Sequence, residues 1–141
     1  MGDIPRPALW LGLAGLIPFL YAALATLTPA AALPFAPPAR VFDTYGLIIF
    51  AYMAGVFWGF SAWGPKEWRG YVLAVAPAVI VFLALIAAPG ATHVILTVAF
   101  PALLLFDRAF HLSNLAPGWY IRLRLLLTTV VFLCFLTGLT G

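Results

Sequence analysis

Five long apolar runs, separated by short polar or proline-rich segments, dominate this chain of 141 residues. Each run has about 20 residues, the length that an α-helix needs to cross the hydrocarbon core of a bilayer. Because 65% of the residues are hydrophobic and only 8% are charged, no soluble catalytic domain fits beside these runs. We therefore expect an all-α integral membrane protein, a compact bundle of five transmembrane helices that forms one domain over residues 1–141. The expected spans are about residues 9–27, 44–62, 71–88, 91–106 and 119–139.

The segments between the runs fix how consecutive helices are joined. Residues 29–43 contain four prolines, which predicts an extended connector after the first span. Pro89 and Gly90 interrupt an apolar stretch that is too long for one crossing, so the third and fourth helices should form a tight hairpin. The first run is longer than the apolar region of a signal peptide, and we interpret it as an uncleaved anchor.

The distribution of basic residues predicts the orientation. With five spans, the N-terminus shares one side of the membrane with the second and fourth loops, and this side holds Arg6, Lys66, Arg69, Arg108, Arg122 and Arg124. The opposite side holds only Arg40. Because basic residues concentrate on the cytoplasmic side, we expect the N-terminus in the cytoplasm and the C-terminus outside. A preference for arginine over lysine is typical of GC-rich bacteria, so we expect a multi-pass protein of a bacterial inner (cytoplasmic) membrane.

Four segments carry a resemblance to a known family: residues 4–19, 45–59, 106–108 and 117–128. Together they resemble the membrane family catalogued as domain of unknown function 3429, relatives of mitochondrial transmembrane protein 69. The resemblance covers nearly the whole chain in order. It implies membrane residence and a compact helical domain, and it brings no activity, cofactor or catalytic residue with it.

A stripe of small residues marks the second span. Ala51, Gly55 and Gly59 recur every fourth residue and therefore share one helix face, on which another backbone can approach closely. We expect this face to pack against another helix of the same bundle. A helix from a different protein is the alternative.

Prolines interrupt three of the expected spans, at Pro18, Pro77 and Pro101. Each lacks the backbone N–H that an α-helix uses, so each predicts a kink. Such kinks either open a cavity between the helices or belong to ordinary packing, and spacing does not separate the two.

Candidate chemistry is sparse. His93 and His111 flank the fourth span and would lie about 27 Å apart on one helix, which favours separate hydrogen-bonding roles over a shared haem or metal site. Cys134 is the only cysteine, so no disulfide within the chain or thiolate metal site is expected. No catalytic or phosphate-binding motif is present. We expect neither enzyme activity nor a cofactor, and the few basic residues argue against nucleic acid as a partner.

Polar and aromatic residues cluster where the fourth span ends and the fifth begins: Asp107, Arg108, His111, Trp119, Tyr120, Arg122 and Arg124. We interpret this cluster as a candidate contact surface, and the alternative is that these residues only anchor the helices at the headgroups. Arg122 and Arg124 cannot share one helix face, so one of them is free to point toward Asp107 or the bundle.

These observations lead to a non-catalytic accessory or assembly factor that contacts lipid and another inner-membrane protein. The alternative is a small uncoupled carrier or channel for a neutral or small solute, with Tyr21, Tyr45 and Tyr52 along a polar path. A membrane-embedded enzyme is the third hypothesis. The oligomeric state stays open.

Overall fold

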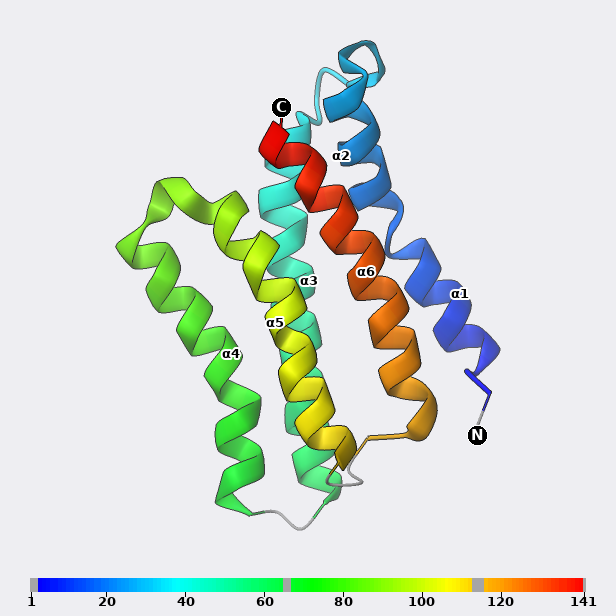
Figure 1. The fold of residues 1–141 in the computed structure, drawn as a ribbon, viewed down its shortest axis with the longest axis vertical. Coiled ribbons are helices and arrows are strands. Elements are labelled where there is room, and N and C mark those ends of the chain that lie inside the picture. The colour runs from blue at the N-terminus through cyan, green and yellow to red at the C-terminus, as the bar shows by residue number, and fades with distance from the viewer. Residues whose placement is uncertain (1–2, 65–66, 113–115, 141) are drawn as a thin grey trace.

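The computed structural model describes residues 3–64, 67–112 and 116–140. These residues form α1 (Arg6–Ala14), α2 (Ile17–Leu27), the 3₁₀ turn η1 (Pro29–Ala31), α3 (Pro38–Trp63), α4 (Trp68–Ala87), the 3₁₀ turn η2 (Pro89–Ala91), α5 (Thr92–Leu112) and α6 (Gly118–Thr140) (Figure 1). With α1 and α2 taken together, five helical segments of 20 to 26 residues are long and apolar enough to cross a membrane. The expected fold class, an all-α bundle of five membrane spans, is confirmed.

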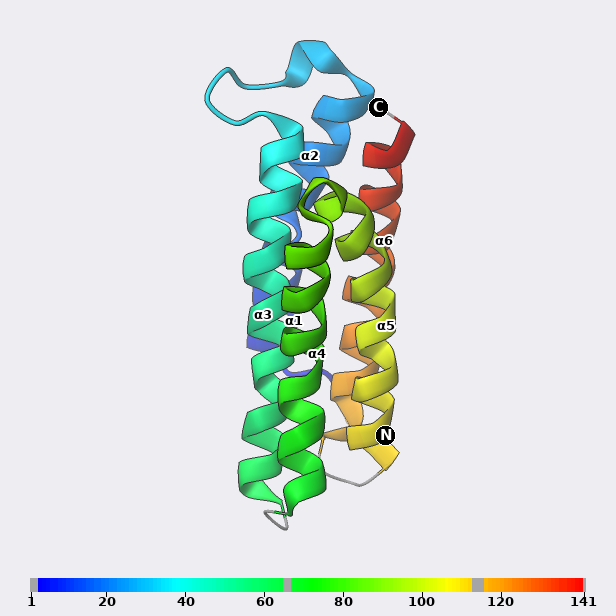
Figure 2. The ribbon, with the colours of Figure 1, turned by 90° about the vertical axis from the view of Figure 1, so that its left-hand side faces the viewer.

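The helices run along the long axis of the molecule (Figure 2). We call the end where α2 passes into α3 the upper end, and the end where α3 passes into α4 the lower end, as Figure 1 is drawn. α5 ends and α6 begins at the lower end. α3 packs against α2, α4 and α5, and α6 packs against α2 and α5, so α1 and α4 lie on the outside of the bundle.

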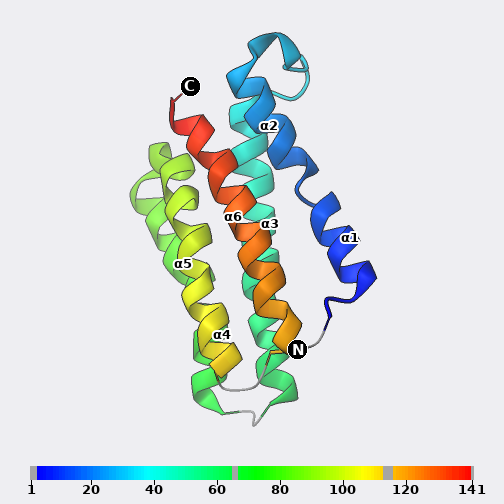
Figure 3. The same cartoon turned by 45° about the vertical axis from the view of Figure 1, so that its right-hand side comes forward.

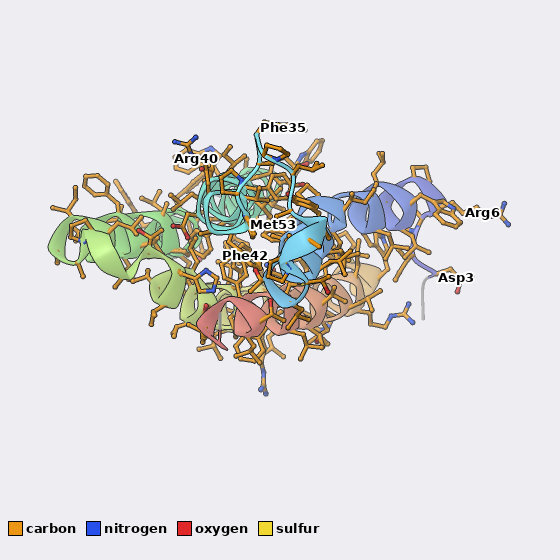
Figure 4. The ribbon with its side chains drawn as sticks, turned by 90° about the horizontal axis from the view of Figure 1, so that it is seen from above. Asp3, Arg6, Phe35, Arg40, Phe42 and Met53 are labelled. Carbon is orange, nitrogen blue, oxygen red and sulfur yellow. The ribbon has the colours of Figure 1, made fainter. Side chains whose placement is uncertain are left out.

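Phenylalanine side chains fill the centre. Phe135 of α6 contacts Phe19, Phe42 and Phe100 from three other helices, with ring centroids 5.0 to 5.7 Å apart. Viewed from above, Phe42 lies in the middle of the bundle, whereas Arg40 on the same helix points outward (Figure 4). Since lipid removes most of the hydrophobic drive between helices, this close ring packing supplies van der Waals contact that holds the helices together.

The first span is broken rather than bent. Pro18 is the second residue of α2, and α1 ends before it in a tight turn in which the N–H of Leu16 donates to the carbonyl oxygen of Leu13 at 3.1 Å. A proline has no N–H and its ring clashes with the carbonyl one turn earlier, so the helix restarts instead of continuing. As a result α1 leans away from α6 and α3 (Figure 3). Pro77 and Pro101 differ, because α4 and α5 continue through them.

Two expected boundaries are wrong. The connector was expected to reach residue 43, but α3 already begins at Pro38, because a proline in the first helical turn loses no hydrogen bond. The fourth span was expected to end at residue 106, but α5 continues to Leu112. Asp107 therefore lies inside the helix and not at its end. Its charge is paired there with Arg124 of α6.

Candidate functional site

A buried ion pair joins α5 and α6 near the lower end. Nε of Arg124 donates to Oδ2 of Asp107 at 3.1 Å, and the two side chains are 4% and 0% exposed. A lone charge at this depth would be costly, whereas a hydrogen-bonded pair of opposite charges offsets most of that cost. The pair is not saturated, since Nη2 of Arg124 and Oδ1 of Asp107 are buried and have no hydrogen-bond partner in the described part of the chain.

A cavity of about 350 Å³ reaches Arg124 from the side of α1. Most of its wall comes from α1 with the turn after it, from α3 and from α6, and Phe19 of α2 and Phe100 of α5 complete it. Gly12 and Gly15 leave room on the α1 side. The lining is largely apolar, and its polar groups include Arg124, Tyr120 and Thr128. The cavity therefore lies beside the break before Pro18, with Leu16 and Phe19 in its wall.

A second cavity of about 390 Å³ lies between α4 and α5. Pro77 of α4 is part of its wall, opposite Val98 and Ala102 of α5. Apolar residues make up its entire lining, so it offers no polar group to a ligand. Acyl chains of the surrounding lipid suit such a surface.

The seven residues of the proposed contact surface do not form one continuous outer face. Asp107 and Arg124 are buried, Arg108 is exposed, and the remaining four are partly buried: His111, Trp119, Tyr120 and Arg122. The ring of Tyr120 packs edge-on against Phe60 of α3, with centroids 5.0 Å apart. Of the two arginines that cannot share a face, Arg124 is the one that points inward to Asp107.

The small-residue stripe of α3 faces outward, which corrects the expectation of packing inside the bundle. Ala51, Gly55 and Gly59 are all exposed, and a Cβ atom added at Gly55 or Gly59 would meet nothing within 4 Å. Helical spacing places the three residues on one face but does not say which way that face turns. The core of α3 instead follows a face that contains Gly46, Phe50 and Phe57.

Close approach of helices depends on glycines that the stripe does not include. A Cβ at Gly46 would lie 2.9 Å from Cζ of Phe135, and a Cβ at Gly70 would lie 2.8 Å from Oγ of Ser61. A Cβ at Gly138 would overlap the ring of His93. These are single glycines without a repeat, so no spacing in the sequence indicates them.

His93 joins α5 to α6 near the upper end. Its Nε2 lies 2.8 Å from the carbonyl oxygen of Phe135, and its Nδ1 lies 3.9 Å from Oδ1 of Asp43 on α3. His111 lies on the last turn of the same helix, at the other end. Within the described part of the chain, no three His, Cys, Asp or Glu side chains come together as a metal site.

Two of the three tyrosines expected along a polar path donate hydrogen bonds to backbone carbonyl oxygens. Tyr45 donates to the carbonyl oxygen of Gly15 at 2.9 Å, beside the break between α1 and α2. Tyr21 donates to the carbonyl oxygen of Ala36 at 2.7 Å and thereby holds the connector. Tyr52 alone of the three contributes to the cavity beside α1. The three therefore do not form a path together.

Comparison with known proteins gives a family and no activity. The family model described as "Protein of unknown function (DUF3429)" matches residues 4–140. Transmembrane protein 69 of Xenopus tropicalis is 34% identical over 134 residues, which cover 91% of this chain and 51% of that protein. Transmembrane protein 69 of Mus musculus is 26% identical over 141 residues, which cover 97% and 57%.

The chain thus spans about half the length of these relatives. No solved structure matches it. The family resemblance noted in the sequence is confirmed, and the five apolar helices agree with the word transmembrane in the relatives' name. This chain is a multi-pass membrane protein that belongs to the family of proteins of unknown function DUF3429.

Proposed function

We propose that this chain is a non-catalytic accessory or assembly factor that docks against another membrane protein through the outward face of α3. The observation that carries the proposal is the exposed stripe of Ala51, Gly55 and Gly59, beside which no other part of the described chain packs. The candidate partner is an apolar transmembrane helix.

The cost of glycine supports this interpretation. A glycine inside a helix costs about 1 kcal/mol relative to alanine, and no contact from the described residues offsets that cost at Gly55 and Gly59. A second helix packed on the stripe would offset this free-energy cost, because small residues let two backbones come close enough for extensive van der Waals contact. Exposed Ile48 and Tyr52 border the stripe and would contact the flanks of such a helix.

The charge pattern limits the partner. The charged residues of α3 are Arg40 and Asp43, both in its first two turns, and the stripe lies further along the helix. An approaching helix therefore has to be apolar at that depth, since any buried charge would be left unpaired.

The proposed setting is the inner membrane of a bacterium, with the lower end in the cytoplasm. The positive-inside rule supports this orientation, because the described basic residues Arg6, Arg69, Arg108 and Arg122 belong to segments at or near the lower end. Arg40 lies in the first turn of α3, at the upper end.

Purification in mild detergent followed by native mass spectrometry tests the proposal. We expect the wild-type chain to retain a different membrane protein at fixed stoichiometry, and the double variant Gly55→Leu/Gly59→Leu to lose that protein while staying folded. Ala78→Leu, which introduces an exposed leucine on α4, should keep the partner. Recovery of the wild type as a monomer, or as a dimer of itself, would contradict the accessory role.

An uncoupled carrier for a small neutral solute is the second candidate, favoured by the cavity beside α1. Flux of neutral solutes into liposomes that contain only the purified chain distinguishes it from the first. Solute uptake that needs no partner would favour the carrier. Liposomes that are no more permeable than protein-free ones would favour the accessory role.

A further inference from the structure

We infer that the cavity between α1, α3 and α6 is a binding site for a neutral, largely apolar molecule that presents carbonyl oxygens to α6. This site does not include the outward stripe of α3, although Tyr52 borders both, and the inference goes beyond the docking function proposed above.

Three polar side chains of the cavity lie in a line on one face of α6. Tyr120, Arg124 and Thr128 are four residues apart on α6, so their side chains stack along the helix. Each has a buried polar atom with no hydrogen-bond partner among the residues that the structure describes: the hydroxyl of Tyr120, Nη2 of Arg124 and Oγ1 of Thr128. A buried donor without a partner costs about 1–3 kcal/mol. Three of them on the wall of one cavity indicate that a ligand or water accepts their hydrogen bonds.

The charge of the site favours a neutral acceptor. Arg124 already shares its charge with Asp107 at 3.1 Å, so the pair is electrically balanced before any ligand enters. An anion would add an uncompensated charge to a poorly solvated site, whereas a carbonyl oxygen accepts hydrogen bonds without doing so. The lining described for this cavity contains no second cation to balance an anion.

The remaining wall suits the apolar part of such a molecule. Leu16, Ile49, Met53, Val56 and Val131 surround the polar line, and the volume of about 350 Å³ falls in the range of small-molecule sites. The cavity is not fully enclosed, so an apolar tail can extend out of it while the carbonyl oxygens reach α6.

Two membrane constituents present this chemistry: the ester carbonyl of a neutral lipid and the ring carbonyl of a quinone. Titration of the detergent-solubilised chain with dioleoylglycerol and, separately, with decyl-benzoquinone, read by native mass spectrometry, distinguishes them. We expect saturable binding of one of these two probes, and the one that binds identifies the source. Oleate, an anion with a similar tail, should bind more weakly than that probe.

Two variants assign the binding to this face of α6 without disturbing the ion pair. Thr128→Val and Tyr120→Phe each remove one unpartnered hydroxyl, and each should weaken binding of the neutral probe by about tenfold. Thr129→Val is the matched control, because Thr129 is exposed and donates to the carbonyl oxygen of its own helix at Leu125. It should bind the probe like the wild type.

The thermal midpoint of the ligand-free chain checks that the variants fold. Thr128→Val should not lower it, since the hydroxyl that it removes has no partner. Tighter binding of oleate than of both neutral probes would overturn the proposal. Unchanged affinity in both hydroxyl variants would also overturn it, as would the absence of saturable binding, which would leave water as the acceptor.

Discussion

Arg124 and Asp107 connect two helices through one hydrogen bond, from Nε to Oδ2 at 3.1 Å, with neither side chain more than 4% exposed. Each residue makes the other tolerable inside a span, because neither charge has enough water to solvate it. The pair therefore fixes the C-terminal part of α5 against the N-terminal part of α6. It also sets the charge balance of the cavity that Arg124 lines.

Removal of either Asp107 or Arg124 alone should lower the stability of the fold far more than removal of both. Asp107→Leu or Arg124→Met alone leaves a buried, unpaired charge, which typically costs about 3–5 kcal/mol of folding free energy. The double variant should recover most of that loss. Thermal unfolding in detergent, followed by circular dichroism, measures the difference. Arg108→Met is the control, since Arg108 is exposed, and single variants as stable as the double one would contradict the pairing.

The same substitution should have opposite effects at two glycines of α3. Gly46→Ala places a methyl group 2.9 Å from Phe135 and 3.1 Å from Leu96, and such overpacking costs about 1–3 kcal/mol. Gly55→Ala meets nothing within 4 Å and should stabilise the isolated chain by up to about 1 kcal/mol through helix propensity. Thermal midpoints of the two variants test this contrast. Equal midpoints would mean that α3 is turned differently about its axis.

Gly138 and His93 should be energetically coupled. Gly138→Ala drives a methyl group into the imidazole ring, and His93→Ala removes both the ring and its hydrogen bond to the Phe135 carbonyl. In the double variant the clash no longer exists, so its loss of stability should be smaller than the sum of the two single losses by about 0.5–3 kcal/mol. A double-mutant cycle of unfolding free energies measures this coupling energy. Strictly additive losses would mean that the two residues are not in contact.

Orientation stays a prediction that reporter fusions can test. The asymmetry of basic residues predicts that alkaline phosphatase fused after α6 is active outside the cytoplasm, and that a cytoplasmic reporter at the same site is inactive. The opposite pair of results would mean that the bundle has the reverse orientation in the membrane.

Span number and fold class were predictable because both depend on local quantities. The length of each apolar run and the breakers between runs, such as Pro89 with Gly90, are visible in any window of the sequence. The interruption at Pro18 was expected as a kink for the same reason, since proline acts on its own helix.

The remaining features depend on contacts between distant segments. The predicted fourth span ended before Asp107 because a charged residue was not expected inside a membrane span. Arg124, which compensates that charge, comes 17 residues later on another helix. The stripe of Ala51, Gly55 and Gly59 was visible, but its direction depends on where α2, α4 and α5 pack around α3. The hydrogen bond of His93 joins residues 42 apart, and no local pattern indicates such a contact.

Site-specific photo-crosslinking in intact membranes tests the central claim, that the outward face of α3 docks a partner, most directly. A photoreactive amino acid is placed at Gly55 and, for comparison, at Ala78 on the exposed face of α4. We predict a protein adduct from position 55 that contains the same partner retained by the purified wild-type chain, and lipid adducts alone from position 78. Lipid adducts alone from both positions would contradict the proposal, because they would mean that the stripe faces the bilayer.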